Sequence, residues 1–142
     1  MDFDLPLTVS FPYLPYPKKG RGPKGIPLAI LGVKSINGFW LDIDVIVDSG
    51  ADFTYLPNKV VRELGISLKQ DCQPIQSHGV GGAAKGYFCK NPLSCKIGSL
   101  EFTMSVVFSS NNFIPPLLGR FQGLDRFRVC MDGKHSSFSK KP

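Results

Sequence analysis

Apolar and polar residues alternate between positions 39 and 47, which is the pattern of a β-strand with one buried face. All positions of one parity are apolar, namely Phe39, Leu41, Ile43, Val45 and Val47. The other parity includes Asp42 and Asp44, which we interpret as solvated side chains. Gly50 ends the run, so the pattern predicts a packed strand that carries the carboxyl group of Asp48 into a tight turn. A carboxylate at such a place is paired, hydrogen-bonded or catalytic, because burial disfavours its charged form.

Two pairs of neighbouring strands are predicted to form hairpins. The apolar run Leu28–Val33 precedes residues 35–38, whose Asn-Gly pair favours a turn into the strand described above. In the second hairpin, a Gly-Ser pair supplies a two-residue turn between Cys95–Ile97 and a strand over Leu100–Phe108.

The remaining predicted elements are short. Further strands are expected at Leu5–Phe11, Thr54–Leu56, Cys72–Ser77, Tyr87–Leu93 and Phe127–Met131. The first of these is expected at a sheet edge, because Pro6 cannot donate to a ladder. A helix is predicted at Pro57–Leu64 with Gly65 as its cap, and a second one at Phe121–Leu124. Together with 15 Gly and 12 Pro residues, these elements favour an all-β domain with one or two short helices.

The length of 142 residues suits one domain with a single core, but not two full lobes. We divide the chain into three parts. Residues 1–25 form an N-terminal strand and a basic Pro-rich segment, residues 26–132 form the main domain, and residues 133–142 are a polar tail that is expected to be disordered.

Residues 78–86 contain four glycines and lie between two predicted strands. They are either a plain hairpin tip or a flap that closes over an extended peptide, since such a segment is mobile and can approach a ligand through its backbone.

The net charge is +6, and basic residues gather in residues 13–25 and near the C-terminus. We interpret these as solvated ends. Neither a stacking-aromatic motif nor a zinc knuckle accompanies them, so nucleic acid is an unlikely partner.

Neither an apolar run of about 18 residues nor a signal peptide at Met1-Asp2-Phe3-Asp4 is found, which predicts a cytoplasmic protein without membrane contact. In that compartment the four cysteines stay as thiols. The spacing of Cys89 and Cys95 is not that of a structural zinc site, so no metal is expected.

Two other catalytic classes fit less well. The segment Trp40–Asp44 looks like the first motif of haloacid-dehalogenase-type phosphatases, but that family also needs a downstream Lys and an acidic pair, whereas Asp125 and Asp132 stand alone. A serine or cysteine hydrolase needs a histidine base, and His78 and His135 both lie in segments expected to be solvated.

Four separated motifs occur in order along the chain: residues 48–52 (Asp-Ser-Gly-Ala-Asp), the Leu-Pro start of the predicted helix at 56–57, the Gly-rich segment at 78–86, and residues 117–120 (Leu-Leu-Gly-Arg). Between about residues 26 and 129 the chain resembles the retropepsin-like (retroviral-type) aspartic proteases, and its helix makes it more similar to cellular or bacterial members than to the compact viral ones. The resemblance implies a closed β-barrel-like acid protease fold and an aspartic endopeptidase activity on peptide or protein substrates.

The resemblance also implies a role for each residue of the first motif. Asp48 matches the catalytic aspartate, and Ser49 matches the hydroxyl residue that hydrogen-bonds across a dimer and holds the two loops rigid. Gly50 lets the backbone come close to the substrate, and Ala51 belongs to the same supporting loop.

Further site residues follow from the same resemblance. Asp52 and Arg120 match a buried ion pair that fixes the active-site loop. The flap tip and the apolar pocket are assigned to Val80, Gly81, Gly82, Leu117 and Leu118.

Aspartic proteolysis needs two facing carboxylates, and this chain has one Asp-Ser-Gly triplet. If the mechanism holds, the second Asp48 comes from another copy of the chain, so a homodimer is expected. The two carboxylates share a proton and activate a water molecule, with no need for a metal or another cofactor. The alternative is a non-catalytic dimeric peptide-binding or assembly module on the same fold, although binding alone would not require the intact triplet.

Overall fold

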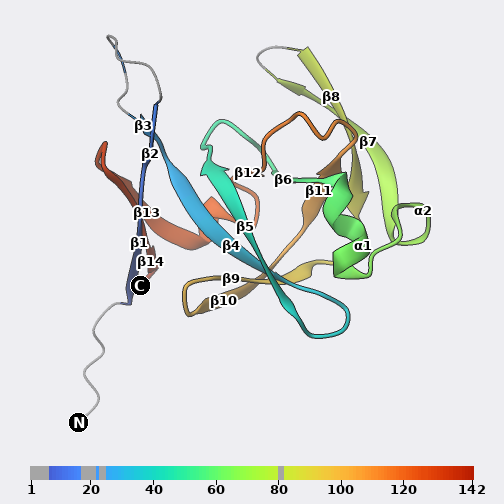
Figure 1. Cartoon of the computed structure of the whole chain (residues 1–142), viewed down its shortest axis with the longest axis horizontal. Coiled ribbons are helices and arrows are strands. Elements are labelled where there is room, and N and C mark those ends of the chain that lie inside the picture. Colours follow the sequence, from blue (N-terminus) through green and yellow to red (C-terminus); the bar gives the residue numbers. More distant parts are fainter. Residues whose placement is uncertain (1–6, 17–21, 23–24, 80–81) are drawn as a thin grey trace.

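The computed structural model describes residues 7–16, 22, 25–79 and 82–142, and these residues fold mostly into strands (Figure 1). The strands are β1 (Thr8–Pro12), β2 (Leu14–Pro15), β3 (Gly25–Ile26), β4 (Leu28–Lys34), β5 (Trp40–Val47), β6 (Thr54–Pro57), β7 (Cys72–Gly79), β8 (Gly82–Cys89), β9 (Leu93–Ile97), β10 (Leu100–Met104), β11 (Val106–Ser109), β12 (Leu117–Leu118), β13 (Phe127–Met131) and β14 (His135–Lys140). The short helices are η1 (Asn58–Val60), α1 (Val61–Leu64), α2 (Leu68–Asp71) and η2 (Leu124–Arg126). The prediction of an all-β fold with short helices is therefore confirmed.

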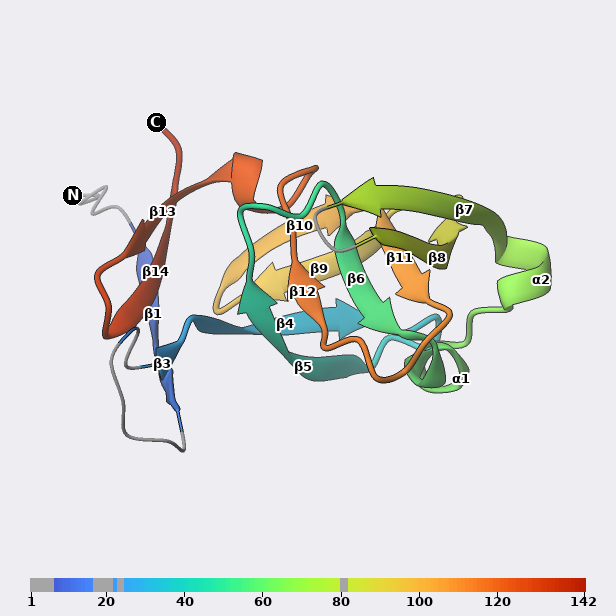
Figure 2. The ribbon, with the colours of Figure 1, turned by 90° about the horizontal axis from the view of Figure 1, so that it is seen from above.

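Nine strands form one sheet in the order β10-β9-β4-β5-β12-β6-β11-β8-β7. Strand β12 lies between β5 and β6, although it follows them in the chain by about sixty residues (Figure 2). It runs parallel to β5, with Leu118 beside Val47, and antiparallel to β6, with Leu117 beside Tyr55. This insertion brings the two motifs that are farthest apart in the sequence into direct contact.

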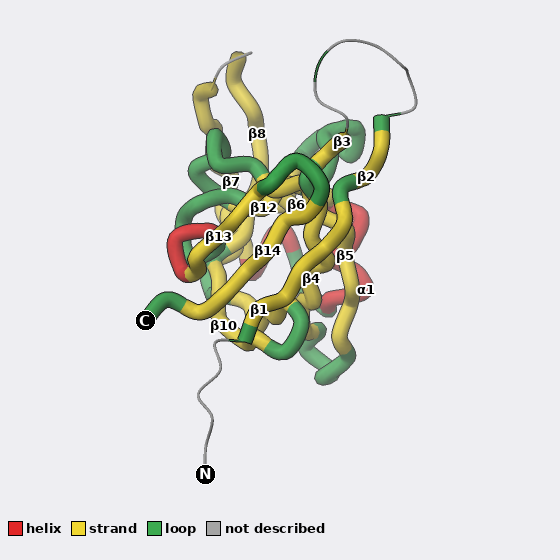
Figure 3. The backbone as a smooth tube through the Cα atoms, turned by 90° about the vertical axis from the view of Figure 1, so that its left-hand side faces the viewer, coloured by secondary structure: helices red, strands yellow, loops and turns green. Residues whose placement is uncertain are grey.

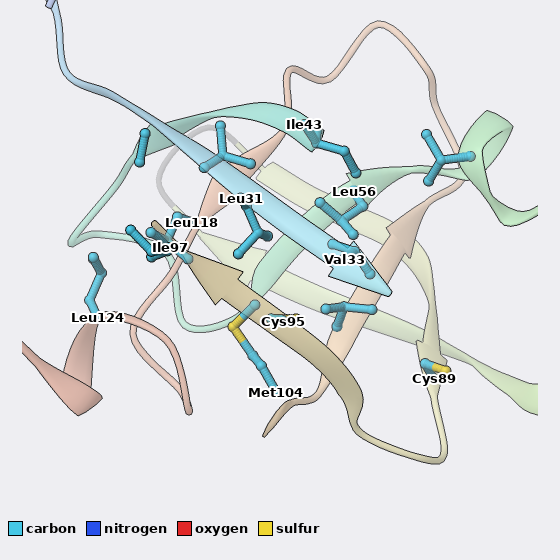
Figure 4. Close-up of a cluster of buried hydrophobic side chains, with 14 of the residues drawn as sticks. Leu31, Val33, Ile43, Leu56, Cys89, Cys95, Ile97, Met104, Leu118 and Leu124 are labelled. Carbon is cyan, nitrogen blue, oxygen red and sulfur yellow. The ribbon is translucent and has the colours of Figure 1, made fainter. Parts of the chain in front are cut away.

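Strand β5 has one buried and one more exposed face, as its alternating pattern predicts. Ile43, Val45 and Val47 are buried in the core, and Asp42 and Asp44 are exposed. Phe39 is the exception, because it precedes β5 and is 73% exposed. Figure 4 shows Ile43 in the core with side chains from the neighbouring strands and from β12, among them Leu31, Leu56 and Leu118.

Both predicted hairpins are confirmed. Strands β4 and β5 pair in antiparallel register, and the Ser35 N–H donates to the Phe39 carbonyl at 2.7 Å to close their turn. Strands β9 and β10 pair across a two-residue turn, in which Gly98 has a φ of 60° that favours glycine.

The single strand predicted for residues 100–108 is wrong, because it is divided at Ser105. There the Ser105 N–H donates to the Gln122 side-chain carbonyl at 2.7 Å instead of to a neighbouring strand. The chain changes partners at this point: β10 pairs with β9, whereas β11 pairs with β6 and β8. An apolar alternation that continues through the break hides it from sequence reasoning.

The predicted helix after β6 is present as η1 followed by α1, and Gly65 ends it with a φ of 75°. Helix α2 was not predicted, although its signal is in the sequence: the Ser67 hydroxyl accepts from the Gln70 N–H, and the Asp71 carboxylate accepts from the Ser67 N–H at 2.8 Å. The helix predicted at residues 121–124 is displaced toward the C-terminus as η2.

The prediction of a disordered tail from residue 133 is wrong. Strand β14 lies between β1 and β13 in a three-stranded sheet (Figure 3). The cause is Phe138, which is fully buried and packs edge-to-face against Phe11 and Phe127. A polar segment with one buried aromatic ring gives little signal by composition, although here it joins the two ends of the chain.

The N-terminal strand is predicted from Leu5 and begins at Thr8, and residues 1–6 lie outside the described residues. It is an edge strand, as expected. Within the basic Pro-rich segment, β2 and β3 form a small two-stranded sheet.

The Gly-rich segment joins β7 and β8, which pair from Cys72↔Cys89 to Gly79↔Gly82. We call β7 and β8 together the flap hairpin after the role expected for its tip, and that role stays a prediction. Its strands are longer toward the tip than predicted, and β8 ends at Cys89, so that Leu93 belongs to β9. Strand β7 is at the end of the nine-stranded sheet.

The described residues lack two kinds of feature. They contain no helix that is long and apolar enough to cross a membrane. They also contain no group of three or more His, Cys, Asp or Glu side chains that could hold a metal ion.

Candidate active site

Asp48 lies directly after β5, where the chain leaves the sheet. Its N–H donates to the Leu118 carbonyl at 3.0 Å, which continues the β5–β12 pairing by one residue. Its carboxylate accepts from the Gly50 N–H at 2.9 Å, and its carbonyl accepts from the Ala51 N–H at 3.2 Å. The side chain is half-buried and is oriented by the turn that follows it. Ser49 and Gly50 are exposed at the tip of this turn.

The second half of the loop is held by the residues after β12. The Arg120 N–H donates to the Ala51 carbonyl at 3.0 Å, and the Phe121 N–H donates to the Asp52 carbonyl at 2.8 Å. At Gly119 a Cβ atom would lie 2.1 Å from the Phe53 carbonyl oxygen, so the backbones approach too closely for any other residue. The close approach of the two backbones explains why position 119 is a glycine.

Sequence reasoning missed Thr54, a fully buried residue that joins the two halves of the site. Its hydroxyl accepts from the Gly119 N–H at 3.1 Å and donates to the Met104 sulfur at 3.3 Å. Because a buried polar group must be hydrogen-bonded, this threonine fixes β12 to the start of β6. The signal available in the sequence was a threonine at the start of a strand that was otherwise predicted to be packed.

Asp52 and Arg120 form the predicted ion pair, but the prediction that the pair is buried is wrong for the single chain. The Asp52 side chain is 65% exposed and the Arg120 side chain is 49% exposed. Both side chains project from a loop and not from a core strand, so water screens their attraction. The backbone hydrogen bonds of the two residues hold the loop more firmly than the charges do.

The two leucines before Gly119 have different environments. Leu118 is fully buried in the core beneath the loop, and Leu117 is half-buried. Neighbouring residues of a strand point to opposite faces, so Leu117 faces away from the side of β12 that packs in the core. The pocket role predicted for the two leucines stays a prediction.

The predicted flap residues are only partly described. Val80 and Gly81 lie outside the described residues, and Gly82 is the first residue of β8. Nearer the base, a Cβ atom on Gly86 would lie 2.6 Å from a Val107 methyl carbon, so glycine lets β8 pack closely on β11.

A cavity of about 380 Å³ lies beside the flap hairpin, and Asp48 does not line it. Its lining residues are Pro74, Ile75, Gln76, Lys85, Gly86, Tyr87 and Ser110. Ser110 begins the loop that leads into β12, and its hydroxyl donates to the Lys85 carbonyl at 2.9 Å. The cavity therefore lies between the flap hairpin and the start of the loop that leads into β12.

An aromatic contact connects the Asp48 loop to the same hairpin. The Phe53 ring packs edge-to-face against Phe88 of β8, with a centroid distance of 5.9 Å, and against Phe121 at 5.8 Å. Phe53 therefore joins the base of the hairpin to the loop that carries Asp48 by direct packing.

The segment Trp40–Asp44, which looked like a phosphatase motif, has a different arrangement. Asp42 and Asp44 are exposed, in agreement with their interpretation as solvated residues. The Lys96 ammonium lies 4.3 Å from the centroid of the Trp40 ring, which is a cation–π contact on the sheet surface.

The family of the chain follows from comparison with known proteins. The sequence profile of a family described as aspartyl protease matches residues 34–120, which include Asp48, the whole supporting loop and Arg120. The chain belongs to the aspartyl protease family. A search of curated proteins finds no significant match.

A solved structure supports the fold of this member of the aspartyl protease family. The chain is similar to a retropepsin-like aspartic protease from Rickettsia conorii, with a TM-score of 0.65 and 18% sequence identity over 99% of this chain and 97% of that one. The predicted retropepsin-like fold is therefore confirmed. The roles of the individual site residues stay predictions.

Proposed function

We propose that this chain is an aspartic endopeptidase that works as a homodimer, with one Asp48 carboxylate from each subunit. The observation that carries the proposal is the position of Asp48, which is held at the end of β5 by hydrogen bonds to Leu118 on one side and to its own turn on the other. A reactive carboxylate must be positioned by groups that do not move, and the sheet provides this.

The second carboxylate comes from another copy of the chain. The nearest carboxylates in the sequence are those of Asp44 and Asp52. Asp44 lies four residues back along the extended strand β5, which separates it from Asp48 by about 13 Å. The Asp52 side chain is paired with Arg120 and is not free to share a proton with Asp48. The exposed face around this ion pair includes the half-exposed ring of Phe121. Such a face would be covered in a dimer, which would also place the two Asp48 loops opposite each other.

In the proposed reaction the two carboxylates hold one proton between them, because two like charges at short range cannot both ionise. The ionised carboxylate removes a proton from a water molecule, and the water oxygen attacks the peptide carbonyl carbon. The protonated one donates to the carbonyl oxygen. The resulting diol collapses when a proton is delivered to the leaving nitrogen.

The substrate in this proposal is an extended peptide. It lies between the flap hairpin and the Asp48 loop, where its backbone pairs as an added strand and its side chains enter apolar pockets. The cavity beside the hairpin, with Ile75 and Tyr87 in its wall, supports this choice. Nucleic acid has no role in the proposal.

The test is incubation of the purified protein with a peptide library between pH 4 and pH 7, with cleavage followed by mass spectrometry. Asp48→Asn is the matched control, because it removes the titrating group at nearly constant shape. Cleavage should disappear in this variant. Cleavage by the unchanged protein should resist chelators and respond to statine-type inhibitors. Equal cleavage by Asp48→Asn would refute the aspartic mechanism, and peptide binding without cleavage by the natural sequence would favour the non-catalytic module.

A further inference from the structure

Two cysteines lie opposite each other at the base of the flap hairpin, at the end far from its tip. Cys72 is the first residue of β7 and Cys89 is the last residue of β8, and the two are direct cross-strand partners. Both residues are buried, with 4% and 2% exposure, and both are free thiols. The proposed peptidase mechanism makes no use of either.

The register indicates how close the two backbones are. Directly opposed residues of an antiparallel pair alternate between hydrogen-bonded and non-hydrogen-bonded positions. Pro74 has no N–H to donate, so it costs the β7–β8 pair no hydrogen bond if it occupies a non-hydrogen-bonded position. We therefore assign Pro74 to that class. Cys72 is two residues away on the same strand and therefore belongs to the same class. Such pairs have Cα atoms about 4.5 Å apart, which is within the range that a disulfide bond spans.

We propose that Cys72 and Cys89 form a reversible cross-strand disulfide that fastens the base of the flap hairpin. Strand β8 is anchored on its other side by β11, whereas β7 ends the sheet. The bond would tie this terminal strand to the anchored one. The residue next to Cys89 is Phe88, which packs on Phe53 of the Asp48 loop, so the fastened base adjoins the proposed active site.

The oxidant in this proposal is a low-molecular-weight disulfide such as oxidised glutathione. One cysteine thiolate attacks a sulfur of the small disulfide, forms a mixed disulfide and releases one small thiol. The second cysteine thiolate attacks the protein sulfur of that mixed disulfide and releases the second small thiol. The two cysteines lose two electrons and two protons, and the oxidant is reduced to two thiols.

The environment of the thiols makes this exchange slow at neutral pH. The pKa of Cys72 is raised to about 12, mainly by burial and also by the neighbouring thiol of Cys89 and the carboxylate of Asp71, while Lys90 acts in the opposite direction. Burial also raises the pKa of Cys89. Since the thiolate is the nucleophile, the rate of disulfide formation should increase with pH throughout the range in which the protein is stable.

The experiment uses the full chain with Cys130→Ser, because Cys130 is exposed and would otherwise form bonds between molecules. The folded protein is incubated with oxidised glutathione at pH 8.5 and is then alkylated and digested with trypsin without reduction. Lys85 lies between the two cysteines, so cleavage there separates them into peptides 70–85 and 86–90. The expected product is these two peptides joined, two hydrogens lighter than their sum.

A second measurement does not depend on the digest. The oxidised protein should melt several degrees above the reduced protein, because the bond restricts the unfolded chain. Cys72→Ala in the same background should lose both the joined peptides and the response of its melting temperature to the oxidant. The proposal is overturned if the folded protein gives only separate glutathione adducts, if Cys89 is joined to Cys95, or if the bond forms only in denaturant. None of these readouts requires peptidase activity, so failure here and failure of the proposed function are distinguishable.

Discussion

Replacement of Thr54 by valine should lower the free energy of unfolding and disturb the loop that carries Asp48. The two side chains have nearly the same shape, so the substitution removes the hydroxyl and leaves no large cavity. The Thr54 hydroxyl accepts from the Gly119 N–H at 3.1 Å inside the protein, and this N–H would lose its partner. A buried donor without a partner costs about 1–3 kcal/mol.

This cost can be converted into a shift of the melting temperature. The unfolding entropy of 142 residues is about 0.3 kcal/mol/K at typical values per residue. A loss of 1–3 kcal/mol therefore corresponds to a decrease of about 3–10 °C. The assay is differential scanning calorimetry at one fixed protein concentration, since the melting temperature of a dimer depends on concentration.

Thr54→Ser is the matched control, because serine keeps the hydroxyl and loses one methyl group, at a cost of about 1 kcal/mol. Thr54→Val should be the less stable of the two and should cleave peptides more slowly than Thr54→Ser. If Thr54→Val has the same melting temperature as the unchanged protein, the hydrogen bond to Gly119 does not hold the loop, and the argument for Thr54 is refuted.

Two further predictions concern the chain ends and the ion pair. Phe138→Ala should cost about 3–5 kcal/mol and lower the melting temperature by about 10 °C or more, because the ring is fully buried between Phe11 and Phe127. A small shift in calorimetry would mean that β14 does not contribute to the core. Arg120→Ala should cost at most about 1 kcal/mol in dilute, dissociated protein, because its pair with Asp52 is exposed there. A large loss of stability under those conditions would contradict the observed exposure.

The sequence pattern predicts those parts of the fold in which local chemistry and packing agree. In β5 the alternation of apolar and polar residues follows the two faces of the sheet, and the Asn-Gly pair matches the turn before it. The position of Asp48 after this strand could therefore be predicted. Leu118 was assigned to the same site only through a family resemblance, since no local rule brings together residues about seventy positions apart, and its hydrogen bond to Asp48 was not predicted.

The misses have specific causes. Strand β14 is polar apart from Phe138, and its stability comes from neighbours on both sides that are distant in the sequence. The division at Ser105 is caused by a hydrogen bond to Gln122, which no periodicity reveals. The exposure of the Asp52 side chain depends on the conformation of the loop that carries it. The burial predicted for it was taken over from the family resemblance.

The central claim is that the active site is built from two chains, and dilution gives a first indication. Activity per subunit should decrease as the protein is diluted through the range in which the dimer dissociates, by mass action. A constant specific activity over that range, with dissociation verified by sedimentation, would argue for a site within one chain.

The most direct measurement is the mixing of unchanged subunits with a tenfold excess of Asp48→Asn subunits, followed by exchange. If subunits pair at random, only about one in eleven unchanged subunits keeps an unchanged partner, so activity per unchanged subunit should decrease to about a tenth. Native mass spectrometry verifies that mixed dimers have formed when the Asp48→Asn subunits are labelled with nitrogen-15, because Asp and Asn differ too little in mass to distinguish unlabelled subunits. If activity per unchanged subunit stays constant while mixed dimers are abundant, the two Asp48 carboxylates do not act together and the proposed mechanism is wrong.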